Sequence, residues 1–193
     1  MSDRTDAHAP IDEPVAASAA APMLYRASVV VFLRSLDRLS TLLARAHDAR
    51  RADPAGIAAL LDARLAPDML PLKTQAEIVC NFALRAAFPL AGEAVPSYGE
   101  FPGDSDGLRA RIARARALLD GLAPARFEDA AGRTIRDRAG EAQVVLPAER
   151  FLFEYALPNL LFHLSMIYAI LRAQGVVLGK ADFDGFHRYG AGP

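Results

Sequence analysis

The chain has 193 residues, 52% of them hydrophobic, and its 22 basic and 23 acidic side chains leave a net charge of −1. A broad nucleic-acid-binding surface needs a clear excess of basic residues, so this balance argues against that class of protein. Cys80 is the only cysteine, which excludes an intramolecular disulfide and a cysteine-rich zinc site, and makes a reducing cytoplasm the simplest location. The length suits one domain with a sizeable core.

The N-terminal part predicts a disordered leader over residues 1–22, followed by helices. The leader is rich in Ala, Pro and Asp, and it lacks the basic start and apolar core of a secretory signal. A long helix is expected from about Leu24 to Arg51, because apolar residues recur there at three- and four-residue spacing. Its polar face carries Arg34, Asp37, Arg38, Arg45 and Asp48. A short helix should follow up to Leu65, with Asp53 as its N-cap and Pro54 at its first position.

The middle of the chain predicts two more helices and a hairpin. The helices are expected over about Leu72 to Leu90, with Asp68 as a cap, and over about 108–119, after a glycine-rich loop at 92–107. The basic face of the later helix is interpreted as solvated. Residues 133–146 then change to two short strands around a Gly turn at 140. A lone hairpin is marginally stable in water, so we expect it to pack on the end of the helices.

The last helix, from about Pro147 to Gln174, is apolar almost all round between Phe151 and Leu171. Such a helix belongs either in the centre of a bundle or in a membrane, and Glu154 and His163 would be costly in lipid. We therefore expect a central bundle helix and no membrane association, so that Phe162→Asp should unfold the domain. The fold class predicted is all-α: a four-helix bundle over residues 23–186, with a C-terminal tail at 187–193. The stretch after the last helix, from residue 176 onward, is expected to be irregular.

Three stretches of the chain carry a resemblance to a known family. They are YRASVVVFLRSLDRLSTLLARA from Tyr25, LLDARLAPDMLPLKTQAEIVCNFAL from Leu60 and ALPNLLFHLSMIYAILRAQGVVLGKADF from Ala156. Together they resemble the bacterial family called domain of unknown function 1993, a branch of the DinB/YfiT-like group. The resemblance implies a DinB-like four-helix bundle, often a homodimer. Many members of the wider group hold a divalent metal with three histidines, and some are thiol-dependent transferases or hydrolases.

The resemblance also points to candidate site residues. The metal-binding relatives have two ligand histidines four residues apart in the last helix, followed by a stretch similar to MIYAILRAQG of this chain. The alignment of these stretches places Asn159 at the first ligand position and His163 at the second. Gln75 is the inward polar residue where the relatives have their third histidine. One imidazole and two neutral amides make a poor zinc or nickel site, so a complete metal site is not expected.

These residues lead to a function hypothesis with two alternatives. We expect an uncharacterised cytoplasmic bundle protein without a cofactor that binds a small molecule between its helices, in a pocket lined by Gln75, Asn159, His163 and Tyr168. One alternative is a divergent metal-dependent transferase or hydrolase, in which His163 is the surviving ligand of a zinc or nickel ion. The other is a structural dimerisation module with a filled centre. The simplest structural role for His163 is that of a core histidine hydrogen-bonded to Asn159 or to a backbone carbonyl. In that case its pKa should lie below its usual value.

Overall fold

The structure is a computed structural model that describes residues 21–187, so most of the predicted leader and residues 188–193 of the predicted tail lie outside the described residues. Within that range the order of elements is helical, then a hairpin, then helical again. The elements are α2 (Met23–Tyr25), the π-helical η1 (Arg26–Val30), α3 (Val31–Ala49), α4 (Pro54–Asp62), α5 (Leu72–Leu90), α6 (Ser105–Asp120), the 3-10 turns η2 (Pro124–Phe127) and η3 (Ala130–Gly132), β1 (Thr134–Ala139), β2 (Ala142–Pro147), α7 (Ala148–Arg150), the π-helical η4 (Phe151–Ala156), α8 (Leu157–Ala173) and α9 (Lys180–Asp184).

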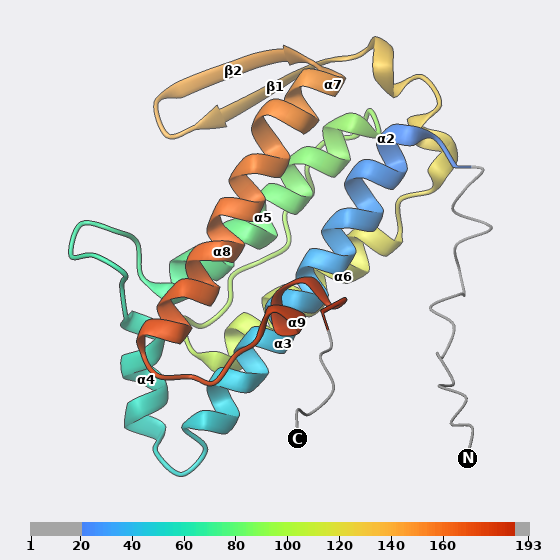
Figure 1. The fold of residues 1–193 in the computed structure, drawn as a ribbon. Coiled ribbons are helices and arrows are strands. Elements are labelled where there is room, and N and C mark those ends of the chain that lie inside the picture. The colour runs from blue at the N-terminus through green and yellow to red at the C-terminus, as the bar shows by residue number, and fades with distance from the viewer. Residues whose placement is uncertain (1–20, 188–193) are drawn as a thin grey trace, which may run out of the picture.

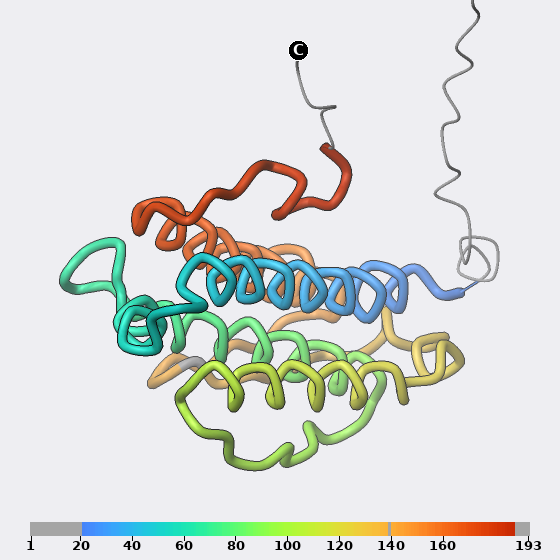
Figure 2. The backbone as a smooth tube through the Cα atoms, turned by 90° about the horizontal axis from the view of Figure 1, so that it is seen from below, coloured from blue at the N-terminus to red at the C-terminus, as the bar shows by residue number. Residues whose placement is uncertain are grey.

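Four long helical rods form a bundle, which confirms the predicted all-α class (Figure 1). Two of the rods are composite, since α2, η1 and α3 follow one another without a break, as do α7, η4 and α8. The tube view in Figure 2 shows α5 between α6 on one side and the first and last rods on the other. Twelve of the 19 residues of α5 are buried, against five of the 17 residues of α8. The centre of the bundle is therefore α5, and the prediction that the last helix lies there is wrong.

The last helix packs through one face only. Leu160, Leu164 and Ile167 point into the core, whereas Phe162 is 51% exposed and its neighbour Leu161 is 43% exposed. The expectation that Phe162→Asp unfolds the domain is therefore wrong, because a sequence that is apolar all round does not say which face is buried. The helix Ala148–Ala173 is long and apolar enough to cross a membrane, a test that the core helix of a soluble protein can also pass.

Two of the helices, α4 and α6, begin with a side-chain cap. Asp53 accepts a hydrogen bond from the Gly56 amide and Asp104 accepts one from the Gly107 amide, so both carboxylates cap a helix start. The predicted cap of α5 is wrong, because its N-cap residue is Pro71 and no side chain bonds its first turn. Pro71 has no side-chain acceptor, and the backbone carbonyl of Pro71 instead accepts from the amide of Gln75.

The hairpin packs on the end of the bundle, as predicted, and an ion pair connects it to α5 (Figure 1). Its strands are antiparallel, with Thr134 opposite Pro147. The Arg85 guanidinium of α5 donates to both carboxylate oxygens of Asp137 in β1, and the Tyr155 hydroxyl donates to the same carboxylate at 3.1 Å. These contacts explain how a two-stranded sheet is stable here.

The segment after α8 is irregular only in part, which corrects another prediction. It forms the short helix α9, and Figure 1 shows this helix lying across α3. Asp182 accepts a hydrogen bond from Arg45 at 3.3 Å, and the ring of Phe183 packs edge-on against Tyr168. Gly185 ends α9 with a φ of +83°, a conformation that glycine adopts without strain. Tertiary contacts rather than local periodicity therefore order this segment.

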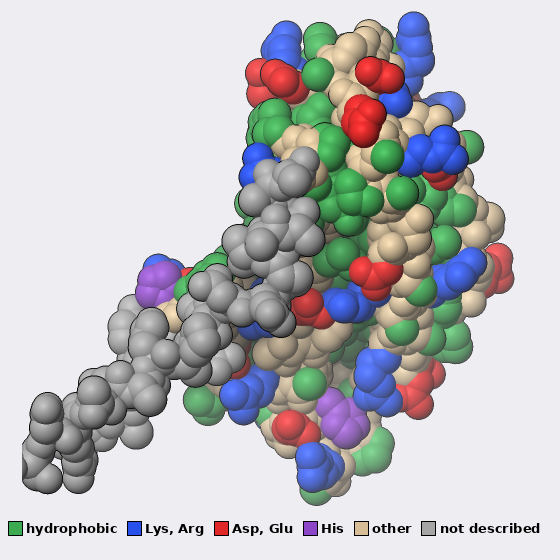
Figure 3. Space-filling model, turned by 90° about the vertical axis from the view of Figure 1, so that its right-hand side faces the viewer, with side chains coloured by type: hydrophobic (Ala, Val, Ile, Leu, Met, Phe, Trp, Pro, Cys, Tyr) green, Lys and Arg blue, Asp and Glu red, His purple; other side chains and the backbone are tan. Residues whose placement is uncertain are grey.

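Charges are mixed on the face of the molecule that Figure 3 shows, where Lys and Arg side chains lie among Asp and Glu side chains. On α6, which the sequence analysis interpreted as a solvated basic helix, Arg116 bonds Asp37 of α3 and Arg109 bonds Asp106. Arg111 lies over the rings of Tyr98 and Phe101. This arginine therefore fastens the long loop before α6 to the bundle.

Candidate functional site

The two helices predicted to hold the site bring Gln75 and His163 into direct contact. The distance from His163 Nδ1 to Gln75 Oε1 is 2.6 Å. The Gln75 side chain lies in the first turn of α5 and is almost completely buried, and its Nε2 donates to the backbone carbonyl of Leu70 at 3.2 Å. Since that carbonyl can only accept, the amide nitrogen must face Leu70 and the amide oxygen must face His163. The imidazole therefore donates through Nδ1.

The protonation state of His163 follows from its surroundings. Burial lowers the pKa of the His163 imidazole below its ordinary value, so the ring is neutral around pH 7. A neutral imidazole that carries its proton on Nδ1 has a lone pair on Nε2. Among the residues that the structure describes, Nε2 has no hydrogen-bond partner, and it is not one of the buried unpaired atoms. His163 thus presents an accessible acceptor, and in chemical terms a weak base.

Two aromatic rings enclose the imidazole. Phe82 of α5 stacks on it with a centroid distance of 6.0 Å and an interplanar angle of 23°, and Phe162 meets it edge-on at 5.2 Å. Phe82 was not predicted as a site residue, although it is seven residues beyond Gln75 and shares its helical face. That spacing was the signal available in the sequence. The rings restrict the imidazole to one orientation.

Asn159 and Tyr168 have other contacts. Asn159 Nδ2 donates to the backbone carbonyl of Tyr155 at 2.7 Å, one turn earlier on the same helical rod. The Asn159 side-chain oxygen has no hydrogen-bond partner within residues 21–187. Tyr168 packs against Phe183 of α9 at 5.8 Å. Of the four predicted pocket residues, a hydrogen bond joins only Gln75 and His163. A ligand pocket shared by all four stays a prediction.

The residues do not fit a complete divalent-metal site. No group of three or more His, Cys, Asp or Glu side chains in the described part of the chain lies close enough to hold an ion. The Gln75 amide is fully engaged, with its oxygen on His163 and its nitrogen on Leu70. His163 Nε2 and the Asn159 oxygen remain, and two neutral donors are too few for zinc or nickel.

A second polar group, formed by Tyr155 and Asp137, lies beside the site. Phe82, which stacks on His163, packs edge-on against Tyr155 at 5.7 Å, and Tyr155 bonds Asp137 of the hairpin. Burial, and then the negative charge of Asp137, raise the pKa of the Tyr155 hydroxyl above its usual value. The pairing of Arg85 with Asp137 joins positions far apart in the chain, and nothing local in the sequence indicates it.

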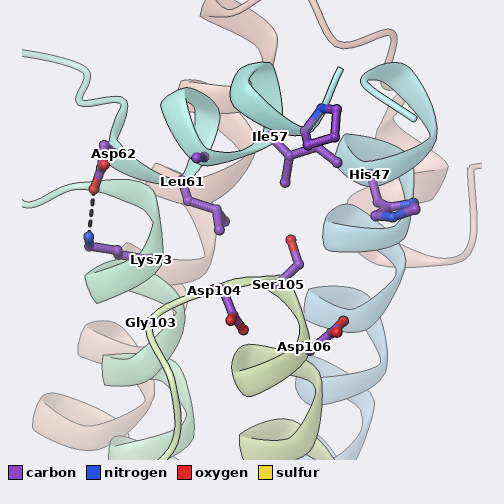
Figure 4. A pocket seen from close by; sticks show the side chains of 11 residues that line it. His47, Ile57, Leu61, Asp62, Lys73, Gly103, Asp104, Ser105 and Asp106 are labelled. Atoms are coloured by element: carbon purple, nitrogen blue, oxygen red, sulfur yellow. Dashed lines mark ion pairs between the residues drawn. The ribbon is translucent and has the colours of Figure 1, made fainter. Parts of the chain in front are cut away.

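A hollow of about 300 Å³ lies at the end of the bundle away from the hairpin, between α4, the ends of α3 and α5, and the start of α6. In Figure 4 Leu61 and Ser105 point into this space, and the ion pair of Lys73 with Asp62, 2.6 Å long, lies at its side. Asp104 belongs to the wall but is occupied as the cap of α6. The charged groups of this hollow are therefore largely committed to one another, and none of the predicted site residues lines it.

Comparison with known proteins places the chain in a family. The model of the family described as domain of unknown function (DUF1993) matches residues 24–184. The chain belongs to the DUF1993 family. A solved relative of this DUF1993 protein is a DinB family member from Shewanella denitrificans, with 33% sequence identity and a TM-score of 0.75, covering 88% of this chain and 96% of that chain. A search of curated proteins gives no match. The DinB-like fold expected from the sequence is thereby confirmed.

Proposed function

We propose that this DUF1993 protein binds a small molecule through His163, and that the molecule donates hydrogen bonds to the site. The observation that carries the proposal is the contact of Gln75 with His163, which holds a neutral imidazole in one tautomer with Nε2 accessible. The Asn159 side-chain oxygen, one helical turn away, offers a second acceptor. Two acceptors beside the aromatic ring of Phe162 suit a ligand with N–H donors on a flat apolar body, such as an aryl amine or amidine.

Matched small probes test this chemistry. We expect benzamidine, at millimolar concentration, to shift the NMR signals of His163 and Phe82, and we expect benzoate, which has the same ring but only acceptors, not to do so. The double variant Gln75→Leu/His163→Leu removes both partners of the buried hydrogen bond, so neither is left unpaired. The Leu70 carbonyl also loses the Gln75 amide, but Leu70 is 43% exposed, so water can take the place of that donor. The double variant should abolish the benzamidine shifts of the Phe82 signals. Equal shifts with both probes, or shifts that survive in the double variant, would overturn the proposal.

We propose that the protein works without a bound metal. We also propose that it works in the cytoplasm, where its single thiol, the buried Cys80, stays reduced. Elemental analysis of protein purified without a histidine tag, before and after incubation with zinc or nickel, tests the first point. We expect no stoichiometric ion. One tightly held ion per chain that is lost in His163→Ala would instead support the alternative of a divergent metal-dependent transferase or hydrolase.

We further propose that the protein is a homodimer whose interface includes the exposed side of α8. Phe153 and Phe162 are 45% and 51% exposed on this rod. Large exposed apolar side chains are a common feature of protein interfaces.

A further inference from the structure

A groove that no predicted site residue lines runs between α3, α8 and the segment that follows α9. Its volume is about 670 Å³, within the range of small-molecule pockets. The groove exists because the chain after α8 turns back across α3. No local sequence pattern indicates this turn. The residues that matter here are Arg34, Arg38, Leu161, Leu164, Phe183 and Phe186.

The charged side of this groove consists of two arginines. Arg34 and Arg38 are four residues apart on α3 and so share a helical face. Neither has a hydrogen bond or ion pair within the described residues, whereas Arg45 on the same helix is paired with Asp182. A guanidinium stays charged at all ordinary pH values, so the groove carries two permanent positive charges.

The one carboxylate in the wall does not neutralise them. Asp184 Oδ1 accepts from the backbone amides of Phe186 and His187 at 2.8 and 3.2 Å, and its other oxygen bonds the His187 ring. Burial opposes ionisation of Asp184, but these hydrogen bonds outweigh it and hold its pKa below the usual value. Both of its oxygens are thus engaged by the turn that follows α9, and neither forms an ion pair with Arg34 or Arg38.

The rest of the groove is apolar and partly open. Leu161 and Phe186 are 43% and 65% exposed, and Leu164 and Phe183 lie deeper. The backbone approaches Arg38 closely at Gly185, where a Cβ atom would lie 3.0 Å from the guanidinium nitrogen. The close approach keeps the cationic group beside the apolar wall. A site with a cationic end and an apolar wall is complementary to an anionic amphipathic molecule.

We propose that this groove binds an aliphatic monocarboxylate, with its carboxylate on Arg34 and Arg38 and its hydrocarbon chain along the leucine and phenylalanine side chains. Arginine forks match the two oxygens of a carboxylate, and such charge-assisted hydrogen bonds are among the strongest available to a ligand. The apolar wall requires a chain of several methylenes and excludes acetate as a tight ligand. This site is separate from His163, so either proposal can fail without the other.

Titration calorimetry of the full chain with decanoate, below its micelle concentration, tests the proposal. We expect saturable binding of one molecule per chain, weakened by added salt and much weaker for decanol, which has the same tail without the charge. Arg34→Gln/Arg38→Gln should reduce the affinity about tenfold or more. Arg114→Gln on α6 removes another exposed arginine without an ion pair and should leave binding unchanged.

Phe186→Ser tests the apolar wall, and its thermal midpoint should not move because the ring is largely exposed. This variant should bind decanoate more weakly than the natural chain. If the double arginine variant fails to fold, the single exposed Arg34→Gln takes its place. The proposal is overturned if decanoate does not bind saturably, if decanol binds as tightly, or if the arginine variants keep full affinity.

Discussion

His163 donates a buried hydrogen bond through Nδ1 and presents Nε2 as an accessible acceptor. The protonation of this imidazole is also linked to the stability of the fold. Burial lowers the pKa of His163 in the folded chain, whereas in the unfolded chain the pKa is about 6.5. Between these two values the unfolded chain binds more protons, so the free energy of unfolding rises with pH in this window and is level above it.

Stability measurements at several pH values test this linkage. The natural chain should lose stability as the pH falls below about 6.5, and the double variant Gln75→Leu/His163→Leu should lose less over the same range. Urea unfolding at a series of pH values gives both curves. Parallel curves would contradict a neutral, desolvated imidazole.

Cys80 illustrates the opposite case, a group with no accessible chemistry. Burial raises the pKa of the Cys80 thiol to about 12, and the side chain has no exposed surface. The thiolate is the reactive form of cysteine, so the folded protein keeps this thiol inert.

The rod formed by α7, η4 and α8 packs against the core through a single face. Substitution of two adjacent leucines on this rod tests that arrangement. Leu160 is fully buried, whereas Leu161 is 43% exposed. We expect Leu160→Ala to lower the free energy of unfolding by about 2–5 kcal/mol. Leu161→Ala should change it by less than about 0.5 kcal/mol. Chemical denaturation of the two variants measures the difference, and equal losses would mean that this face is covered.

The hairpin depends on Asp137, because that carboxylate bonds both Arg85 of α5 and Tyr155 of η4. Asp137→Ala leaves a largely buried guanidinium without its partner, and we expect a loss on the order of 3 kcal/mol. Hydrogen exchange of the hairpin amides should accelerate in the same variant. Glu154→Gln is the control, because the pair of Glu154 with Arg150 is exposed and its removal should have no measurable effect. A stable Asp137→Ala variant would show that the hairpin does not need this contact.

Much of the element order could be predicted from the sequence. Local signals sufficed for α5, which begins directly after Pro71, and for the hairpin around Gly140. Periodicity also located the inward Gln75. Apolar composition did not distinguish the two faces of α8, and the five residues of α9 are too few for a periodic signal. The Arg85 pairing with Asp137 and the groove beside Arg38 depend on tertiary contacts that local patterns do not encode.

At the scale of the whole molecule, the proposed dimer interface on the exposed side of α8 has a clear consequence. Phe162→Asp places a charge on the exposed side of α8 without touching the core. The variant should remain folded by circular dichroism, and sedimentation should find it a monomer at concentrations where the natural chain is a dimer. Phe153→Asp should behave in the same way. Dimers that persist in both variants, or a natural chain that is monomeric, would contradict the proposed interface.

The most direct test of the central claim is the tautomer of His163, read from the ring nitrogen chemical shifts of ¹⁵N-labelled protein at about pH 7.5, above the ordinary histidine pKa. The structure predicts a protonated Nδ1 and an unprotonated Nε2, and it predicts that benzamidine moves the Nε2 signal. A proton on Nε2, or equal populations of the two tautomers, would show that Gln75 does not hold the ring and would contradict the acceptor site.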